Sequence, residues 1–208
     1  MPRRKVTDPQ VLIDAAARLF MRKGYQNTTI DDLADEVGIS KPTVYQYVKS
    51  KRWLLESIFE TVLKRLETDQ DRIIVEIDDP ADQLRESIRY YVNAVADLQP
   101  YFHIFFGEEA ELPKRTQKRF REWARRMSDK LTTILRDCAK RNEVRTDVDP
   151  QIASFLLIGM LASVYRWYDV KGPLKTEEIA AQATAMLEGY LLNGAKPKAS
   201  RFRKASLN

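Results

Sequence analysis

Apolar residues recur three and four positions apart along nearly the whole chain, which is the spacing that gathers them on one face of an α-helix. In the first forty residues this pattern predicts two helices, each followed by a glycine that acts as a stop signal. Thr29 can cap the second helix, because its hydroxyl accepts from a free backbone N–H of the first turn. The apolar positions are Val11, Leu12, Ala15, Ala16, Leu19 and Phe20 before Gly24, and Ile30, Leu33, Ala34 and Val37 before Gly38.

A third predicted helix, from Lys41 to about Val48, departs from this pattern because only Val44 and Val48 form its inner side. Ser40 can cap it, and a proline in its first turn is harmless because no backbone N–H is needed there. Two short helices joined by a glycine-containing bend form a helix-turn-helix. We therefore predict that the valines pack inward and the remaining surface contacts DNA; a short polar helix exposed without a role is the alternative.

The outward side chains of this third helix are of the kinds that contact bases and phosphates. Lysine donates to guanine, threonine offers a methyl group and a hydroxyl, and glutamine hydrogen-bonds adenine. Lys51, at the start of the next helix, would combine its ammonium with free N-terminal N–H groups in a phosphate site. The outward residues are Lys41, Thr43, Gln46 and Tyr47.

The remainder of the chain is also predicted to be helical, so the fold class is all-α. Proline-containing breaks at 78–80 and 99–100 end two helices, and residues 101–107 fit no single element. A long amphipathic helix follows from about Pro113, with many Arg and Lys on a solvated side. The domains we predict are an N-terminal three-helix unit at 1–51, a C-terminal helical domain at 52–194, and a disordered basic tail at 195–208.

The segment from Pro150 to Tyr168 has almost no polar side. A helix that is apolar all round must be buried all round. In a chain of 208 residues this predicts that one face packs on its own fold and another on a second subunit. We expect the last helix, from about Thr176 to Leu192, to join this homodimer seam, with Leu157 inside it.

The net charge of +5 is unevenly distributed. Residues 1–51 hold nine Lys/Arg and six Asp/Glu, and residues 195–208 hold five basic residues and no acid, so the part between them is acidic. Positive charge on the N-terminal unit favours a polyanion partner, although basic tails also serve solubility. No apolar run is long enough for a bilayer and the start lacks a secretory pattern, so we expect a cytoplasmic protein without a membrane partner.

Motifs for catalysis and metal binding are missing from the sequence. The single cysteine, Cys138, has the spacing of an apolar helical face and excludes an internal disulfide or a multi-cysteine zinc site. The single histidine, His103, lies among phenylalanines, and pairing it with one of the acids at 108–111 has no supporting motif. We therefore predict no enzymatic activity, no metal and no cofactor.

The stretch "TTIDDLADEVGISKPTVYQYVKSKRWLLESI", from Thr28 to Ile58, resembles the DNA-binding domain of the TetR family of bacterial transcriptional regulators. The similarity covers roughly residues 9–60 and includes the Lys-Pro-Thr-x-Tyr-x-Tyr run and the Lys-x-x-Leu-Leu that opens the fourth helix. One departure is Val48, where many relatives have phenylalanine. The resemblance implies phosphate contacts from Thr29, Tyr45, Tyr47 and Lys51, and base contacts from Lys41, Pro42, Thr43 and Gln46.

The same resemblance implies a C-terminal domain that binds a ligand and dimerises through its last two helices. The stretches "FFGEEAELP" and "RWYDVKGPLKTEEIAAQ" are similar to members that respond to fatty-acyl or related coenzyme A thioesters. The implied function is a repressor that binds a near-palindromic DNA operator as a homodimer and is released by a hydrophobic small molecule. Phosphates of such a ligand would meet Arg166, or Arg119, Arg125 and Arg126. The candidate ligand-binding residues are Tyr91, Phe102, Phe106, Trp123, Met127, Arg166 and Trp167.

Alternatives to this function remain open at this stage. A similar DNA-binding protein without an effector, with a structural or cell-division role or as an activator, fits the same motif. An apolar chamber in the C-terminal domain favours effector control, whereas collapsed aromatic side chains favour the alternative. The arm Arg3-Arg4-Lys5 either adds phosphate or minor-groove contacts or has no fixed position.

Overall fold

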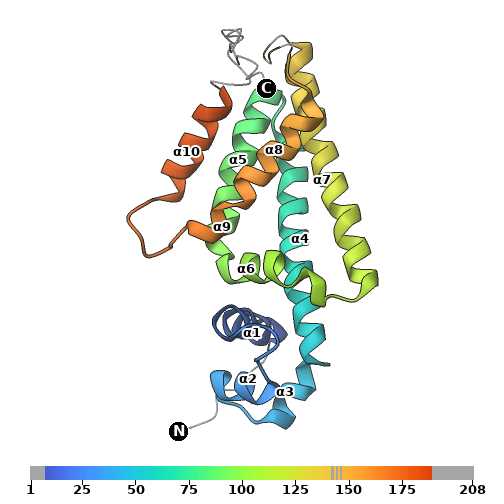
Figure 1. Ribbon diagram of the computed structural model, residues 1–208, viewed down its shortest axis with the longest axis vertical. Helices are drawn as coiled ribbons and strands as arrows, with labels where there is room; N and C mark the ends of the chain where they lie inside the picture. Colours follow the sequence, from blue (N-terminus) through green and yellow to red (C-terminus); the bar gives the residue numbers. More distant parts are fainter. Residues whose placement is uncertain (1–7, 142, 144, 146, 189–208) are drawn as a thin grey trace, which may run out of the picture.

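The computed structural model of the chain describes residues 8–141, 143, 145 and 147–188, and in this part every regular element is helical, as the sequence predicted. Three short helices form a unit at one end of the molecule (Figure 1). The basic arm at 3–5, the tail at 195–208 and the predicted end of the last helix lie outside the described residues. The three helices are α1 (Pro9–Lys23), α2 (Ile30–Val37) and α3 (Lys41–Tyr47).

Local hydrogen bonds fix the ends of these three helices. The predicted cap at Thr29 is confirmed, because its hydroxyl accepts from the Asp32 backbone N–H at 3.1 Å while the Asp32 carboxylate accepts from the Thr29 N–H at 2.8 Å. This reciprocal arrangement satisfies two N–H groups that a helix start leaves unpaired. The Ser40 hydroxyl caps α3 by accepting from the Thr43 N–H, and Gly38 ends α2 with a φ of 74°, which only glycine adopts without strain.

The long helix α4 (Lys51–Glu76) leaves the N-terminal unit and continues through the centre of the C-terminal part (Figure 1). The predicted break at 78–80 is confirmed, since Asp79 caps α5 with Pro80 at its first position. Helix α6 lies across the junction between the two parts and starts where α5 was expected to end. The further elements are α5 (Pro80–Asp97), α6 (Gln99–Gly107), η1 (Glu109–Glu111), α7 (Lys114–Lys140), α8 (Pro150–Ala162), α9 (Val164–Trp167) and α10 (Thr176–Leu187).

The segment from Pro150 to Tyr168 differs from the prediction because it is not one continuous helix. It is divided into α8 and α9 at Ser163, whose hydroxyl donates to the Met160 carbonyl at 2.7 Å and competes with the helical hydrogen bonds there. Within one chain it is buried on one side and exposed on another, and the prediction assigned the second side to a contact with another subunit. Ile152, Phe155 and Leu156 are 61%, 54% and 68% exposed, whereas Leu157 is 4% exposed.

Leu157 was therefore wrongly assigned to the predicted seam. It packs toward the interior with Leu161 and Leu131, while its neighbour Leu156 faces outward. The physical reason is that α8 is apolar on every side, so its sequence has no polar positions that indicate the outer face.

The packed interior forms two clusters, one reaching from the N-terminal unit to α6 and the other between α5, α7, α8 and α10, and the partly buried Tyr91 and Ile179 pack against both. Cys138 is fully buried, as predicted, and burial raises the pKa of its thiol to about 11. A thiol with so high a pKa is mostly protonated at neutral pH and acts as a small apolar side chain. No helix in the described part of the chain is long and apolar enough to cross a membrane.

Candidate DNA interface and ligand cavity

The third helix presents a polar surface to solvent, as its sequence predicted. Val44 and Val48 are fully buried against the rest of the N-terminal unit. Lys41, Tyr45 and Gln46 are exposed, and no other part of the described chain covers them. A helix of this length with its inner side held by two valines is free to enter a groove of DNA with its other sides.

Lys41 is held near α2 by an exposed ion pair. Its ammonium lies 2.8 Å from the Asp31 carboxylate, and this hydrogen bond raises the pKa of Lys41. Exposed pairs of this kind contribute little to stability because water screens them. Lys41 can therefore exchange Asp31 for a base or a phosphate at low cost.

The two predicted threonine contacts already have partners within the chain. The Thr29 hydroxyl takes part in the α2 cap and lies 2.9 Å from the Asp32 carboxylate. The Thr43 hydroxyl lies 2.7 Å from the hydroxyl of Ser40. Thr29 is exposed and Thr43 is half-buried, and of the other predicted contacts Pro42 is exposed and Tyr47 half-buried. Contacts of the two threonines with DNA would share oxygens that also stabilise the helix starts.

Lys51 departs from the role that its sequence position suggested. Its ammonium donates to three backbone carbonyls of the loop between α1 and α2, those of Tyr25, Gln26 and Thr28, at 2.9, 3.1 and 2.9 Å. It also lies 4.6 Å from the centre of the Tyr25 ring. Because an ammonium has three donors, these carbonyls occupy all of them. The predicted ammonium contact with phosphate does not fit this geometry, and only the backbone N–H groups at the start of α4 remain available.

An apolar cavity of about 160 Å³ lies in the C-terminal part, bounded by α4 to α8. Four of the predicted ligand residues line it: Tyr91, Phe106, Trp123 and Met127. The polar lining comes mainly from Gln70 and Ser87, which are joined by a hydrogen bond of 3.0 Å. The other lining residues are Leu66, Ile88, Phe105, Phe120, Ala124, Leu131, Leu157, Ile158 and Leu161.

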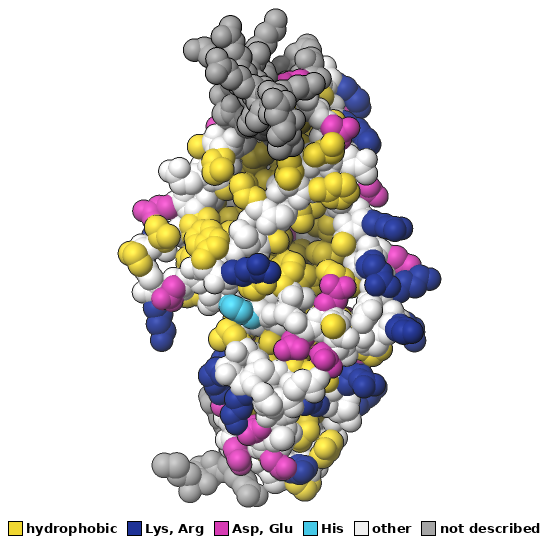
Figure 2. Space-filling model, viewed as in Figure 1, with side chains coloured by type: hydrophobic (Ala, Val, Ile, Leu, Met, Phe, Trp, Pro, Cys, Tyr) yellow, Lys and Arg dark blue, Asp and Glu magenta, His cyan; other side chains and the backbone are white. Residues whose placement is uncertain are grey.

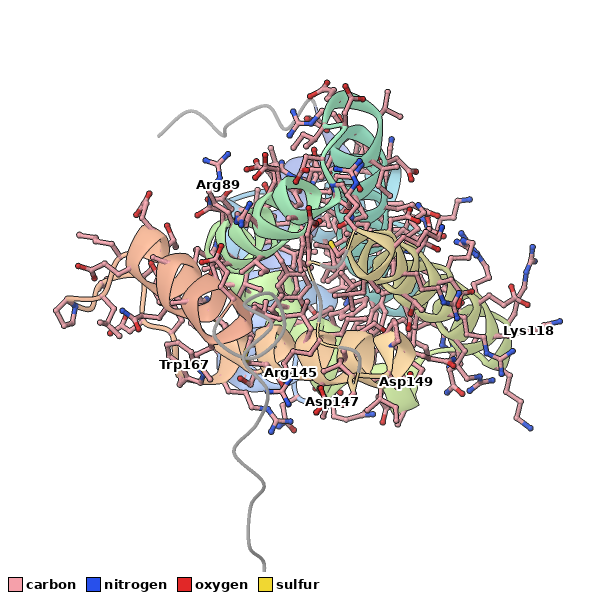
Figure 3. All side chains as sticks on the ribbon, turned by 90° about the horizontal axis from the view of Figure 1, so that it is seen from above. Arg89, Lys118, Arg145, Asp147, Asp149 and Trp167 are labelled. Carbon is pink, nitrogen blue, oxygen red and sulfur yellow. The ribbon has the colours of Figure 1, made fainter. Side chains whose placement is uncertain are left out.

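The other three predicted ligand residues lie elsewhere. Phe102 is fully buried behind the wall and packs edge-on against Tyr91 with ring centres 5.9 Å apart. Arg166 is exposed and donates to the Tyr165 hydroxyl at 3.0 Å. Trp167 lies at the outer edge of the molecule beside α10 (Figure 3), where it lines a separate shallow groove.

The sequence interpretation selected mainly aromatic residues, with Met127 and Arg166, and therefore missed most of the aliphatic and polar parts of the cavity wall. Gln70 and Ser87 gave a usable signal, since each is a polar residue at an inner position of an otherwise apolar helical face. Leu157 and Leu161 gave none, because the pattern of α8 is uniform.

A wide apolar area covers the face of the molecule formed by α8, α9 and α10 (Figure 2). Isolated exposed apolar residues are common, but a contiguous area is a mark of an interaction surface. We define this exposed apolar face as Ile152, Phe155, Leu156, Trp167, Leu174 and Met186.

Two helices connect the cavity with the N-terminal unit. Helix α4 carries Lys51 at one end and cavity residues further along. In α6, Phe105 and Phe106 line the cavity, while the Tyr101 hydroxyl donates to the Asp14 carboxylate of α1 and accepts from Gln10 at 2.9 Å. Burial raises the pKa of Tyr101, so its hydroxyl remains a donor across the physiological range.

His103 has the surroundings of a packed side chain. Its ring lies edge-on to Tyr165 with centres 5.2 Å apart, and burial lowers its pKa. The described residues contain no group of acidic, histidine or cysteine side chains arranged for a metal. The surroundings of His103 give no indication of a catalytic site.

An exposed helix-turn-helix surface connected by shared helices to an apolar cavity defines a DNA-binding regulator with a ligand-binding domain. Comparison with protein families agrees. Residues 12–58 match the family described as bacterial regulatory proteins, tetR family, and residues 77–191 match the tetracyclin repressor-like C-terminal domain. The chain belongs to the TetR family of bacterial transcriptional regulators, and it is a regulator and not an enzyme.

Individual relatives span nearly the whole chain. It is 25% identical over 179 residues to the transcriptional repressor KstR2 of Mycolicibacterium smegmatis, covering 86% of this chain and 87% of that protein. The crystal structure of PfmR from Thermus thermophilus is similar with a TM-score of 0.80 at 27% identity, covering 88% of this chain and 99% of that one. AibR, solved in complex with isovaleryl coenzyme A and operator DNA, has a TM-score of 0.74 at 24% identity, with coverage of 86% and 96%.

Proposed function

We propose that this protein is a transcriptional repressor that binds a near-palindromic operator as a homodimer and leaves it when a small acyl compound occupies the cavity. The observation that carries the proposal is that the cavity wall includes parts of α4 and α6, the two helices that also contact the N-terminal unit. A ligand that repositions this wall would also reposition the DNA-binding surface.

The exposed apolar face supports the homodimer. Leaving Ile152, Phe155 and Leu156 in water is unfavourable by roughly 25 cal/mol per Å² of apolar surface, and a second copy removes this cost. A symmetric pair uses the same face on both chains and presents two copies of α3. If these lie one DNA turn apart, about 34–36 Å, the operator has two inverted half-sites.

The cavity supports an apolar ligand group of modest size. A protein cavity of about 150 Å³ lined by Leu, Ile and Phe side chains holds a benzene molecule. The cavity of about 160 Å³ in this chain therefore accepts an apolar group of similar bulk. A long fatty-acyl chain would require the wall to open further, so we propose a short or compact acyl group. AibR, which has the same fold, was solved with isovaleryl coenzyme A, whose acyl group is short and branched.

The open cavity favours effector control over a DNA-binding protein without a ligand. Many aromatic rings of α6 and α7 pack on one another, including Phe105 with Trp123 at 5.9 Å between ring centres. Even so, they leave an apolar space next to Tyr91 and Met127. A protein without an effector gains nothing from this space, because an empty cavity lowers stability.

The proposal is tested by selecting the operator from random DNA and then measuring its release. Fluorescence anisotropy with a labelled operator should show binding by a dimer that decreases on addition of short acyl carboxylates or acyl-CoA thioesters. A coupling of about 1–3 kcal/mol corresponds to a five- to 150-fold weaker affinity at saturation. Unchanged operator affinity across carboxylates and thioesters of two to twelve carbons would exclude this class of effector.

A further inference from the structure

Trp123 of α7 belongs to the wall of two separate spaces. One is the apolar cavity, and the other is a polar groove of about 570 Å³ between α4 and α7. We call the second space the α4–α7 groove. Because the same indole forms part of both walls, the groove and the cavity meet at this side chain. The charged residues around the groove include Glu60, Lys64, Glu67, Arg119, Glu122 and Arg126.

The indole N–H of Trp123 has no hydrogen-bond partner in the described part of the chain, although it is buried. The side chain as a whole is 8% exposed, so water does not readily replace the missing partner. An indole N–H can only donate, and a buried donor without an acceptor is unfavourable. The N–H of Trp123 can therefore donate a hydrogen bond to an acceptor atom of a ligand.

The groove beside Trp123 is closed by ion pairs that are easily exchanged. Arg119 lies 2.7 Å from Glu60, and Arg126 lies 3.2 Å from Glu67. Both pairs bridge α7 and α4 and are largely exposed, so they hold the groove together only weakly. A polar or anionic group can take the place of Glu67 on Arg126 without leaving the arginine unpaired.

We propose that the ligand is an acyl compound whose carbonyl oxygen accepts a hydrogen bond from Nε1 of Trp123. This inference rests on the proposed function and names the ligand class at that site. The apolar part, of about the bulk of benzene, occupies the cavity, and the remainder of the molecule lies in the α4–α7 groove. A free carboxylate and a coenzyme A thioester both offer such an oxygen, and the experiment distinguishes them.

The test follows the indole signals of the ¹⁵N-labelled full-length protein by NMR. The chain has three tryptophans, and Trp123→Phe assigns the signal of interest. Hexanoate, hexanoyl-CoA and hexane serve as probes with the same apolar bulk, of which hexane lacks an acceptor. We expect the Trp123 N–H signal to move downfield with the carboxylate or the thioester, whichever is the source, and to keep its ligand-free position with hexane.

Affinities give the second readout. Trp123→Phe keeps an aromatic ring but removes the donor, so it should weaken acyl binding about tenfold and leave hexane binding unchanged. Trp53→Phe, which lies outside the cavity, the α4–α7 groove and the exposed apolar face, is the matched control and should change neither. Equal losses for hexane and the acyl probe would show that Trp123 only packs, which overturns the inference.

The two proposals fail in different ways. If acyl probes release the operator while the Trp123 signal stays in place, the proposed function stands and the role of Trp123 is wrong. If no acyl probe binds at all, both are wrong.

Discussion

The N-terminal unit and the C-terminal part of this chain are stabilised by different means. Around α2 and α3, caps, loop carbonyls and ion pairs fix the backbone, and the buried side chains are small and few. The C-terminal part is built from longer helices around aromatic and aliphatic side chains, and it contains a cavity that its own atoms do not fill. Directional hydrogen bonds give the first region one geometry, whereas apolar packing allows the second to rearrange around a ligand.

The largest expected effect comes from the exposed apolar face. Leu156→Glu should convert the dimer into a folded monomer and lower operator affinity at least about a hundredfold, because two linked half-site contacts become one. Sedimentation and anisotropy measure both changes. Val75→Glu on α4 is the control, since Val75 is exposed outside this face. An intact dimer in the Leu156 variant would place the interface elsewhere.

The next effect concerns Lys51. Lys51→Met removes three hydrogen bonds to the α1–α2 loop and should reduce the free energy of unfolding by about 2 kcal/mol in urea titrations. Lys49→Met, at an exposed neighbouring position, is the control. If the variant instead has normal stability and the salt slope of its operator binding falls by about one, the ammonium of Lys51 contacts a phosphate after all.

Gln46 allows the DNA-binding role of α3 to be separated from its stability. Gln46→Ala should leave unfolding unchanged, because the side chain is exposed. It should cost about tenfold in affinity at one base pair of each half-site and leave the salt slope as it was. Binding-site selection with both proteins measures this, and a uniform loss on every sequence would argue against base recognition.

A smaller effect is expected where the two regions meet. Tyr101→Phe removes the hydroxyl that joins α6 to Asp14 and Gln10 of α1 while keeping the buried ring. Operator and ligand should each still bind. The factor by which saturating ligand lowers operator affinity should be roughly three times smaller than in the wild type. Undiminished coupling, measured by anisotropy with and without ligand, would leave α4 as the connection.

The smallest effect is a dependence on pH. Hydrogen bonds from Lys23 and from Thr29 lower the pKa of the Asp32 carboxyl to about 2. The ordinary pKa of this group is 3.8. The carboxylate of Asp32 therefore contributes fully to stability above that pH, and the contribution is lost as the pH falls toward 2. Asp32→Asn should therefore be slightly less stable at neutral pH and should lose less stability between pH 4 and pH 2. Equal slopes in both proteins would mean that this carboxylate does not contribute.

Sequence reasoning succeeded where polar and apolar positions contrast. The cap at Thr29, the break before Pro80 and the inward valines of α3 all follow from local patterns, and all were confirmed. It failed on α8, because a uniformly apolar helix does not distinguish Leu156 from Leu157.

Contacts between segments that are distant in the chain could not be predicted from the sequence either. The carbonyls that surround Lys51 lie 23 to 26 residues before it, and nothing in either segment indicates the pairing. For the same reason the unpaired N–H of Trp123 could not be anticipated, since it depends on what the folded chain fails to place beside it.

Helix α4 has 26 residues and, at 1.5 Å per residue, a length of about 39 Å. A rigid rod of that length acts as a lever arm, so a tilt of about 5° about one end moves the other by about 3 Å. Such a displacement is comparable with the separation between neighbouring base pairs. A small tilt of α4 around a molecule no larger than benzene would therefore move the DNA-binding end of the helix by about one base-pair step, so that it no longer matches its half-site.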